Sequence, residues 1–342
     1  MSEQYFGRYY KLTLGSGSEQ MVFETEAGRP AMDIKFDVTF ARGVTAREGT
    51  ISILGLSRDT ILKYLMLSGE TRGKAMSQLM EVKLEVGYFS EAGTVEILNG
   101  FAWYGTVTAP PEMWLTLKIS EYNPMGGKSL ELTEKDALMP IKEAVEDILA
   151  QFSKAESGGG KDITFKLEDK THDGIDPDAR VKYSILGKKT LGDVIRDLNQ
   201  QTEGIKFILR TRNQQEGVRT LLAVDADSTK FTQAANFPLI DGDHGLLSVS
   251  GIDAVNGCIT TFIDGRVADE LTKIKLESWL NPQANGEYII VKKQYVGHFL
   301  GQEWYSRYFC SDRVGANRNN GNSSETGQEA PQMSDYDRAN TY

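Results

Sequence analysis

Apolar and polar residues alternate one by one in the first and last thirds of the chain, and this alternation restricts the fold more than any other feature. Ile34, Phe36 and Val38, for example, alternate with Lys35 and Asp37. A period of two is typical of a β-strand that buries one face and leaves the other in solvent. The predicted strands are residues 34–40, 50–53, 82–86 and 115–119 in the first third, and 258–263, 273–278, 286–296 and 303–309 in the last third.

The middle of the chain has helical spacing instead. Apolar residues recur at intervals of three and four between Leu138 and Phe152. This spacing predicts a helix, and Pro140 lies near its start, where the first turn tolerates proline. A Gly-rich turn and a short strand at 163–165 follow.

A second helix is expected at residues 191 to about 202. Thr190 and Asp193 approximate a capping box, in which Asp replaces the usual Glu. Two apolar strands, 205–209 and 221–224, then flank a polar turn, which is typical of a β-hairpin. The two helices and the hairpin together indicate a small α+β module.

These patterns divide the chain into four parts. We predict a mainly β fold in which an α+β module at 122–240 is inserted between β regions at 1–121 and 241–312. Residues 313–342 form a polar tail with few large aliphatic side chains. Such a segment buries too little apolar area to offset the entropy lost on ordering, so we expect a flexible tail.

Charge and composition exclude several classes of protein. The formal net charge is −10, which argues against a general nucleic-acid binder, because such proteins neutralise phosphates with Lys and Arg. No apolar run approaches the roughly 20 residues that a membrane helix needs, so no membrane segment is expected. Residues 1–5 lack the apolar stretch of a secretory signal. The two cysteines are too few for a disulfide framework, and we expect both to be reduced and buried in a cytoplasmic product.

Two short stretches resemble nucleotide or metal sites but depart from the patterns. Residues 126–129 read Gly-Gly-Lys-Ser, which resembles the end of a phosphate loop. Such a loop also needs a glycine five residues before Gly127, but that position is occupied by Tyr122. Residues 225–229 resemble the opening of a calcium loop. The turn glycine is replaced there by Lys230, and the twelfth position is Asn236 rather than Glu. We interpret both stretches as connections.

The remaining candidate ligands lack partners in the sequence. The cluster Asp-Gly-Asp-His at 241–244 has no further ligand at a fitting spacing, which favours a solvated turn. His172 and His298 have no recognisable nucleophile beside them, and neither Cys258 nor Cys310 has a nearby base. The sequence therefore assigns no catalytic, cofactor-binding or metal-ligating residue.

Several motifs resemble the baseplate hub proteins of contractile-tailed bacteriophages. Residues 51–60 resemble a strand-to-helix passage of those proteins, with Gly55 in place of the usual Asn. Residues 190–198, followed by a hairpin, resemble their helix-plus-hairpin, and residues 285–291 resemble part of their last β region. Further matching positions are Val82, Leu84, Gly87, Tyr88, Ile97, Gly100, His298 and Trp304. The order of the motifs across residues 8–310 carries the resemblance.

The resemblance implies two tube-type β-barrel domains in one chain, separated by the inserted module. It implies a homotrimeric ring that joins the sixfold tail tube, or a tube-initiator protein, to the threefold central spike. The ring would also contact other baseplate proteins. Genomic DNA would pass through its channel without specific binding, and no cofactor would be needed. The expected location is the tail baseplate of the virion, after assembly in the host cytoplasm.

Two alternatives to a phage hub stay open at this point. A tail-associated peptidoglycan hydrolase would carry its carboxylates in the α+β module, and a turbidity or zymogram assay on cell wall would reveal it. The equivalent hub of a contractile injection machine without a genome would look the same in sequence, and gene neighbourhood would separate the two. The missing catalytic motif favours a structural protein over an enzyme.

Overall fold

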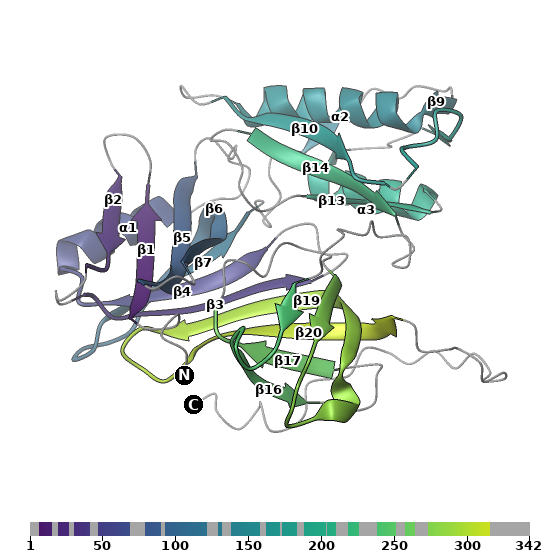
Figure 1. Cartoon of the computed structure of the whole chain (residues 1–342). Helices are drawn as coiled ribbons and strands as arrows, with labels where there is room; N and C mark the ends of the chain where they lie inside the picture. Colours follow the sequence, from purple (N-terminus) through teal and green to yellow (C-terminus); the bar gives the residue numbers. More distant parts are fainter. Residues whose placement is uncertain are drawn as a thin grey trace.

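The computed structural model of the chain is shown in Figure 1. It describes residues 7–15, 20–26, 31–41, 47–68, 79–89, 93–121, 129–131, 138–157, 162–171, 173–182, 188–202, 204–209, 218–225, 238–250, 257–263 and 273–314. Over these residues the protein is mainly β with an inserted α+β module, which confirms the predicted fold class.

One 13-stranded sheet runs through both β regions. The first region contributes β1 (Arg8–Leu14), β2 (Met21–Glu24), β3 (Ile34–Ala41), β4 (Glu48–Leu54), β5 (Met80–Tyr88), β6 (Thr94–Val107) and β7 (Trp114–Ser120). The last region contributes β15 (Leu239–Ile240), β16 (Leu246–Ser250), β17 (Gly257–Thr261), β18 (Lys273–Leu276), β19 (Gly286–His298) and β20 (Trp304–Val314). The main path is β16-β17-β20-β19-β3-β4-β7-β6-β5-β1-β2, and β18 joins β15 to β19 beside it.

The alternation seen in the sequence builds the core of the first region. In β3, Ile34, Phe36 and Val38 are buried on one face. The equivalent positions of β4, β5 and β7 join them in one hydrophobic cluster. Helix α1 (Arg58–Ser68) adds Ile61 and Tyr64 to the same core. The sheet therefore buries one face, and its other face is left for solvent or partners.

The last region has a smaller core of its own, which includes Ile259, Ile274 and Tyr308. Strands β19 and β20 serve both cores, because Tyr295 and Trp304 at one end of this hairpin belong to the first core. The other end of the hairpin reaches the second core. The two β regions thus share a pair of long strands.

The described strands form an open path and show no closed barrel, which differs from the two separate tube-type barrels that the resemblance implies. The reason lies in β3, which pairs with β4 on one edge and with β19 on the other. Hydrogen bonds that could close the first region on itself instead join it to the last region.

The α+β module has a separate sheet, drawn above the large sheet in Figure 1, and a core that also includes Leu79 and Phe101 of the first β region. Its sheet consists of β10 (Thr164–Asp169), β14 (Val218–Asp225) and β13 (Ile205–Leu209), with β10 and β14 parallel. Its helices are α2 (Ile141–Glu156) and α3 (Leu191–Gln201). Two short ladders pair β9 (Leu138–Pro140) with β11 (Arg180–Lys182) and β8 (Leu130–Glu131) with β12 (Lys188–Lys189).

The start of the first module helix was predicted wrongly. Leu138 lies in β9 and is 65% exposed, and Pro140 precedes the helix as its N-cap residue. The ψ angle of Pro140 is 134°, which is extended rather than helical. Because β9 pairs with β11, the residues before Ile141 are held in a β-ladder, and this tertiary pairing overrides their helical spacing.

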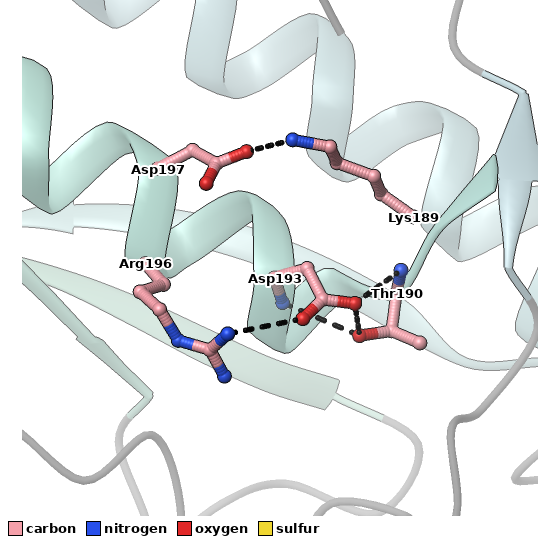
Figure 2. Close-up of polar contacts among 5 residues, drawn as sticks. All are labelled: Lys189, Thr190, Asp193, Arg196 and Asp197. Carbon is pink, nitrogen blue, oxygen red and sulfur yellow. Dashed lines mark hydrogen bonds and ion pairs between the residues drawn. The ribbon is translucent and has the colours of Figure 1, made fainter. Parts of the chain in front are cut away.

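The start of α3 confirms the predicted capping box, and Figure 2 shows its contacts. The Asp193 amide donates to Thr190 Oγ1 at 3.2 Å, and the Thr190 amide donates to Asp193 Oδ2 at 3.2 Å. The hydrogen bond from the Thr190 hydroxyl, supported by the positive charge of Arg196, holds the pKa of the Asp193 carboxyl below its ordinary value. An Asp at this position therefore performs the role of the usual Glu.

The passage from β4 to α1 also follows the sequence. Gly55 has φ +92°, a left-handed conformation that glycine and asparagine adopt most readily. Ser57 caps the helix, because its Oγ accepts a hydrogen bond from the Thr60 amide at 3.2 Å. The substitution of Gly55 for the family's Asn is thus consistent with the backbone.

The domain limits at 121, 240 and 312 stay predictions. Strand β20 continues to Val314, and residues 315–342 of the predicted tail lie outside the described residues.

Candidate interaction surface

The two β regions meet at the pairing of β3 with β19, which runs from Lys35 opposite His298 to Ala41 opposite Lys292. Gly297 is essential to this contact. A Cβ atom there would lie 2.1 Å from Cζ of Phe36, so only glycine allows the Phe36 ring to cover the strand. The junction is therefore both hydrogen-bonded and packed.

A partly buried clamp holds the turn between β19 and β20 against the first region. Arg8 Nη1 donates to the carbonyl oxygens of His298, Phe299 and Gly301 at 2.9, 3.0 and 2.6 Å. The Arg8 guanidinium also lies 5.5 Å from the ring centre of Trp304. Burial lowers the pKa of Arg8 from its ordinary value, although an arginine remains charged at neutral pH.

Asp33 also holds this turn. Its Oδ2 is 2.8 Å from His298 Nε2, and its Oδ1 accepts from the Leu300 amide at 3.1 Å. Trp304 Nε1 donates to the Gly87 carbonyl at 3.3 Å. His298, which the sequence left without a partner, is therefore a structural residue of the turn.

The outward face of the sheet carries a continuous polar surface across the junction, which we call the open face. The strand registers place Lys118, Thr50 and Asp37 in one row, beside Val296 and Tyr305. A neighbouring row contains Thr116, Ser52, Lys35 and His298. The open face therefore extends from the first β region into the last one without a break in the sheet.

A groove of about 480 Å³ hollows the open face at the junction. Polar side chains of mixed charge line it, including Lys35, Asp37, Gln294, Glu303 and Arg307. Gln294 Nε2 donates to both Asp37 oxygens, at 2.9 and 3.0 Å. The groove thus offers hydrogen-bonding groups that already pair across the two β regions.

Basic side chains on the open face lie over aromatic rings. The Lys35 ammonium is 4.1 Å from the ring centre of Trp114, and the Lys118 ammonium is 5.6 Å from that of Tyr104. Lys292 lies 4.9 Å from the Phe309 ring. Cation–π contacts of this kind hold a charge in place while leaving it partly accessible, which suits a surface that contacts partners.

A second candidate surface is the loop after β18. Trp279 is 79% exposed and Leu280 is 72% exposed. The short 3-10 helix η5 (Pro282–Ala284) follows them. The sequence analysis did not single out this pair. The signal was present, because Trp279 and Leu280 directly precede Asn281-Pro282, and this dipeptide is typical of a turn.

The cluster at 241–244 forms a turn, as predicted. Asp241 Oδ1 accepts from the amides of Asp243 and His244 at 2.9 and 2.8 Å and lies 2.6 Å from His244 Nδ1. Partial burial alone would raise the pKa of the Asp241 carboxyl, but the hydrogen bonds from His244 outweigh it and lower that pKa. The carboxylate thus stabilises its own turn.

The two cysteines differ in exposure. Cys310 is buried, as expected, and burial raises the pKa of its thiol to about 12. Cys258 is only partly buried, which corrects the prediction, because it lies on the open face of β17 opposite Phe309. Burial also raises the pKa of the Cys258 thiol, so neither group is an activated nucleophile at neutral pH.

The described residues hold no group of three or more His, Cys, Asp or Glu side chains suited to a metal ion. His172 and the stretches at 126–128 and 226–236 lie outside the described residues. Within the part of the chain that the structure describes, no helix has both the length and the apolar character needed to cross a membrane.

Comparison with solved structures finds this fold in tail proteins. A tail protein from Neisseria meningitidis MC58 matches 90% of this chain and 97% of its own chain, with a TM-score of 0.55 and 9% identity. The 43 kDa tail protein of prophage MuSo2 from Shewanella oneidensis matches 88% of this chain and 96% of its own, with a TM-score of 0.52 and 8% identity.

The chain is also similar to a PdpA–VgrG complex, with a TM-score of 0.53 and 8% identity over 93% of this chain and 67% of the other. No family model matches the sequence, and no curated protein matches it either. At these identities the likeness establishes a shared fold across nearly the whole chain, and the fold is that of phage tail proteins.

Proposed function

We propose that the chain is a structural hub protein of a phage tail baseplate. Three copies form a ring that joins the sixfold tail tube to the threefold central spike and continues the DNA channel. The pairing of β3 with β19 carries the proposal, because it fixes the two β regions of one chain side by side in one sheet. Three such chains supply six β regions, which is the arrangement that an adaptor between sixfold and threefold partners needs.

The likeness to tail proteins supports this role, because it covers both β regions and the module together. The open face supports it as well. A ring subunit must bury one face of its sheet against a core and offer the other face, or its edges, to neighbouring proteins. Neighbouring copies of the chain, the tube and other baseplate proteins are the partners that we assign to this face.

The charge of the ring suits passage of DNA without specific binding. Three chains carry a formal 3 × (−10) = −30. A predominantly acidic assembly keeps a polyanion from adhering, because adhesion depends on phosphate neutralisation by Lys and Arg.

The copy number tests the proposal. The full-length chain is purified alone and after co-expression with a candidate spike protein, and its mass is measured under native conditions. Three copies, alone or on the spike, are expected. Six or twelve copies around the axis, or a chain that stays monomeric in both preparations, would overturn the hub assignment. A turbidity assay on purified cell wall is run in parallel, and lysis would establish the hydrolase alternative.

The hub of a contractile injection machine is the second candidate function. The similarity to a PdpA–VgrG complex favours it, because that likeness extends over almost all of this chain. Electron microscopy of particles that contain the protein separates the two. Tails attached to DNA-filled heads identify a phage, and headless contractile particles identify an injection machine.

A further inference from the structure

The loop that carries Trp279 and Leu280 is rigidly built although its two apolar side chains project outward. The Ser278 amide donates to Asn285 Oδ1 at 2.6 Å, and the Asn281 amide donates to Ser278 Oγ at 3.1 Å. Ala284 at its far end is buried. An exposed Trp on a fixed loop is a typical anchor of a protein–protein interface, because its burial yields a large apolar contact at little further entropic cost.

The surroundings of this anchor are acidic. A hollow of about 710 Å³ beside Trp279 is lined by Asp241, Asp243 and Glu277, among others. Lys275 also lines it and pairs with Glu277 at 2.6 Å, so these two charges offset each other, and Asp241 and Asp243 leave the hollow acidic. The partner that covers this loop therefore needs an apolar surface next to a basic group.

The first β region offers such a surface on β6 and β7. Tyr104 is 47% exposed and pairs in register with Lys118, so both side chains lie on the same face of the sheet. The Lys118 ammonium lies 5.6 Å from the Tyr104 ring and 5.9 Å from the Trp103 ring. We call Trp103, Tyr104 and Lys118 the aromatic–basic patch. It combines exposed aromatic surface with an accessible positive charge, which complements the acidic anchor loop.

The two surfaces lie at opposite ends of the large sheet. Strand β19 begins at Gly286, just after the anchor loop, and its last residue, His298, has its ring 6.3 Å from that of Trp114 at the β6–β7 hairpin. Thirteen residues of strand span about 40 Å. Figure 1 shows the start of β19 and the β6–β7 hairpin at different ends of the molecule. One chain therefore cannot join its own two surfaces, whereas a neighbour in a head-to-tail arrangement can.

We propose that the Trp279–Leu280 loop of one copy docks on the aromatic–basic patch of the next copy. This inference rests on the proposed ring, for which it names the contact between subunits. Trp279 and Leu280 pack against the rings of Tyr104 and Trp103, and Lys118 faces the carboxylates of the acidic hollow. The contact is heterologous, so its repetition around a closed ring satisfies every loop and every patch.

Cysteine cross-linking of the full-length chain tests the contact. Trp279→Cys and Tyr104→Cys are introduced singly and together on a Cys258→Ser background, and each protein is treated with a short bis-maleimide over a series of concentrations. The double variant is expected to give cross-linked dimers and trimers, with the trimer as the limit. Leu300→Cys paired with Tyr104→Cys is the matched control, since Leu300 is 70% exposed but belongs to neither surface.

Affinity gives a second measurement. Trp279→Ala is expected to weaken trimer formation on the order of tenfold or more, as truncation of an aromatic anchor usually does. Leu300→Ala should leave it unchanged. Circular dichroism establishes that both variants keep the β fold.

The outcomes separate this inference from the proposed function. A trimer that forms without cross-links between the two cysteines, and with unchanged affinity in Trp279→Ala, overturns the contact and leaves the ring standing. Cross-links from Trp279→Cys to a co-expressed spike protein also overturn the contact. A ladder beyond three chains supports the head-to-tail contact but overturns the closed trimer.

Discussion

The last β region and the α+β module are attached to the first β region in different ways. The last region is joined through backbone hydrogen bonds between β3 and β19, reinforced by Trp304 in the first core. The module is joined mainly through side chains. Arg219 of β14 lies 5.4 Å from the Phe101 ring of β6, and Phe40 of β3 packs with Ile208 and Val224.

The last region therefore shares its strands and core with the first region, whereas the module is docked on the sheet. Strands that belong to two cores cannot leave one core without disrupting the other, so the two β regions are expected to unfold together. A module with its own sheet, and with a core built mostly from its own residues, can lose its structure while the sheet beneath it remains. Such a division suits the ring subunit that we propose.

The largest expected effect comes from Trp304→Ala. The Trp304 side chain is 3% exposed and lies 5.1 Å from the Phe36 ring, so its removal leaves a cavity at the junction of the β regions. We expect a loss of about 3–5 kcal/mol in the free energy of unfolding. Urea unfolding followed by tryptophan fluorescence and circular dichroism measures it.

The Trp304→Ala variant also tests the comparison itself. Amide hydrogen exchange should show lower protection in β3 and β20 alike. Protection lost in the last region alone would mean that the two regions are independent domains. Leu300→Ala in the same turn serves as the control, because the Leu300 side chain is 70% exposed and should change stability little.

A smaller effect on the whole molecule is expected from Leu198→Asp. Leu198 of α3 is buried in the module core, and an unpaired carboxylate there costs several kcal/mol. Hydrogen exchange should increase in α2, α3 and β13, whereas the large sheet stays protected. Phe36→Asp in the first core is the comparison, and its loss of soluble protein sets the scale for global unfolding. An equal loss in Leu198→Asp would contradict a separate module.

A weaker change is expected from Arg219→Met, which acts on the seam between module and sheet. Burial lowers the pKa of Arg219, while Glu121 and neighbouring carboxylates of the first region favour its charge. Methionine keeps much of the stem but leaves these carboxylates without that charge. We expect the free energy of packing between module and sheet to weaken by about 2 kcal/mol. Faster proteolysis between module and sheet would report this change. Arg196→Met, on the exposed side of α3 and away from the seam, should leave the rate of proteolysis between module and sheet unchanged.

The fold class followed from the sequence because period-two alternation and helical spacing are local signals. Strands β3, β4, β5 and β7 each fall where alternation predicts, since each buries every second side chain. The pairing of β3 with β19 has no local signal, because the two segments lie about 250 residues apart and only their packing selects them. Pro140 illustrates the same limit, since pairing with β11 decides its conformation.

The candidate surfaces were less predictable than the fold. The open face consists of polar residues whose individual strands are visible in the sequence, but the row from Lys118 to Tyr305 exists only once five strands are in register. Arg8 gave no signal at all, because its acceptors are backbone carbonyls of a turn. The sequence did identify the 241–244 turn, since an Asp that caps its own turn is a local feature.

The smallest effect concerns the pH dependence of the module through Asp193. Its pKa is lowered in the folded protein, so the stability that it contributes is present above its unfolded pKa, about 3.9. That contribution is lost as the pH falls through the lower folded value. Asp193→Ala should therefore destabilise the module by about 1 kcal/mol at pH 7, and the difference from the parent should shrink below pH 4. Hydrogen exchange of α3 in Asp193→Ala and in the parent, at pH 7 and at pH 3, measures this difference. Asp197→Ala is the matched control, because Asp197 lies on the same helix and pairs with Lys189 without capping it. A difference at pH 3 as large as that at pH 7 would mean that the Asp193 side chain stabilises the module without its charge.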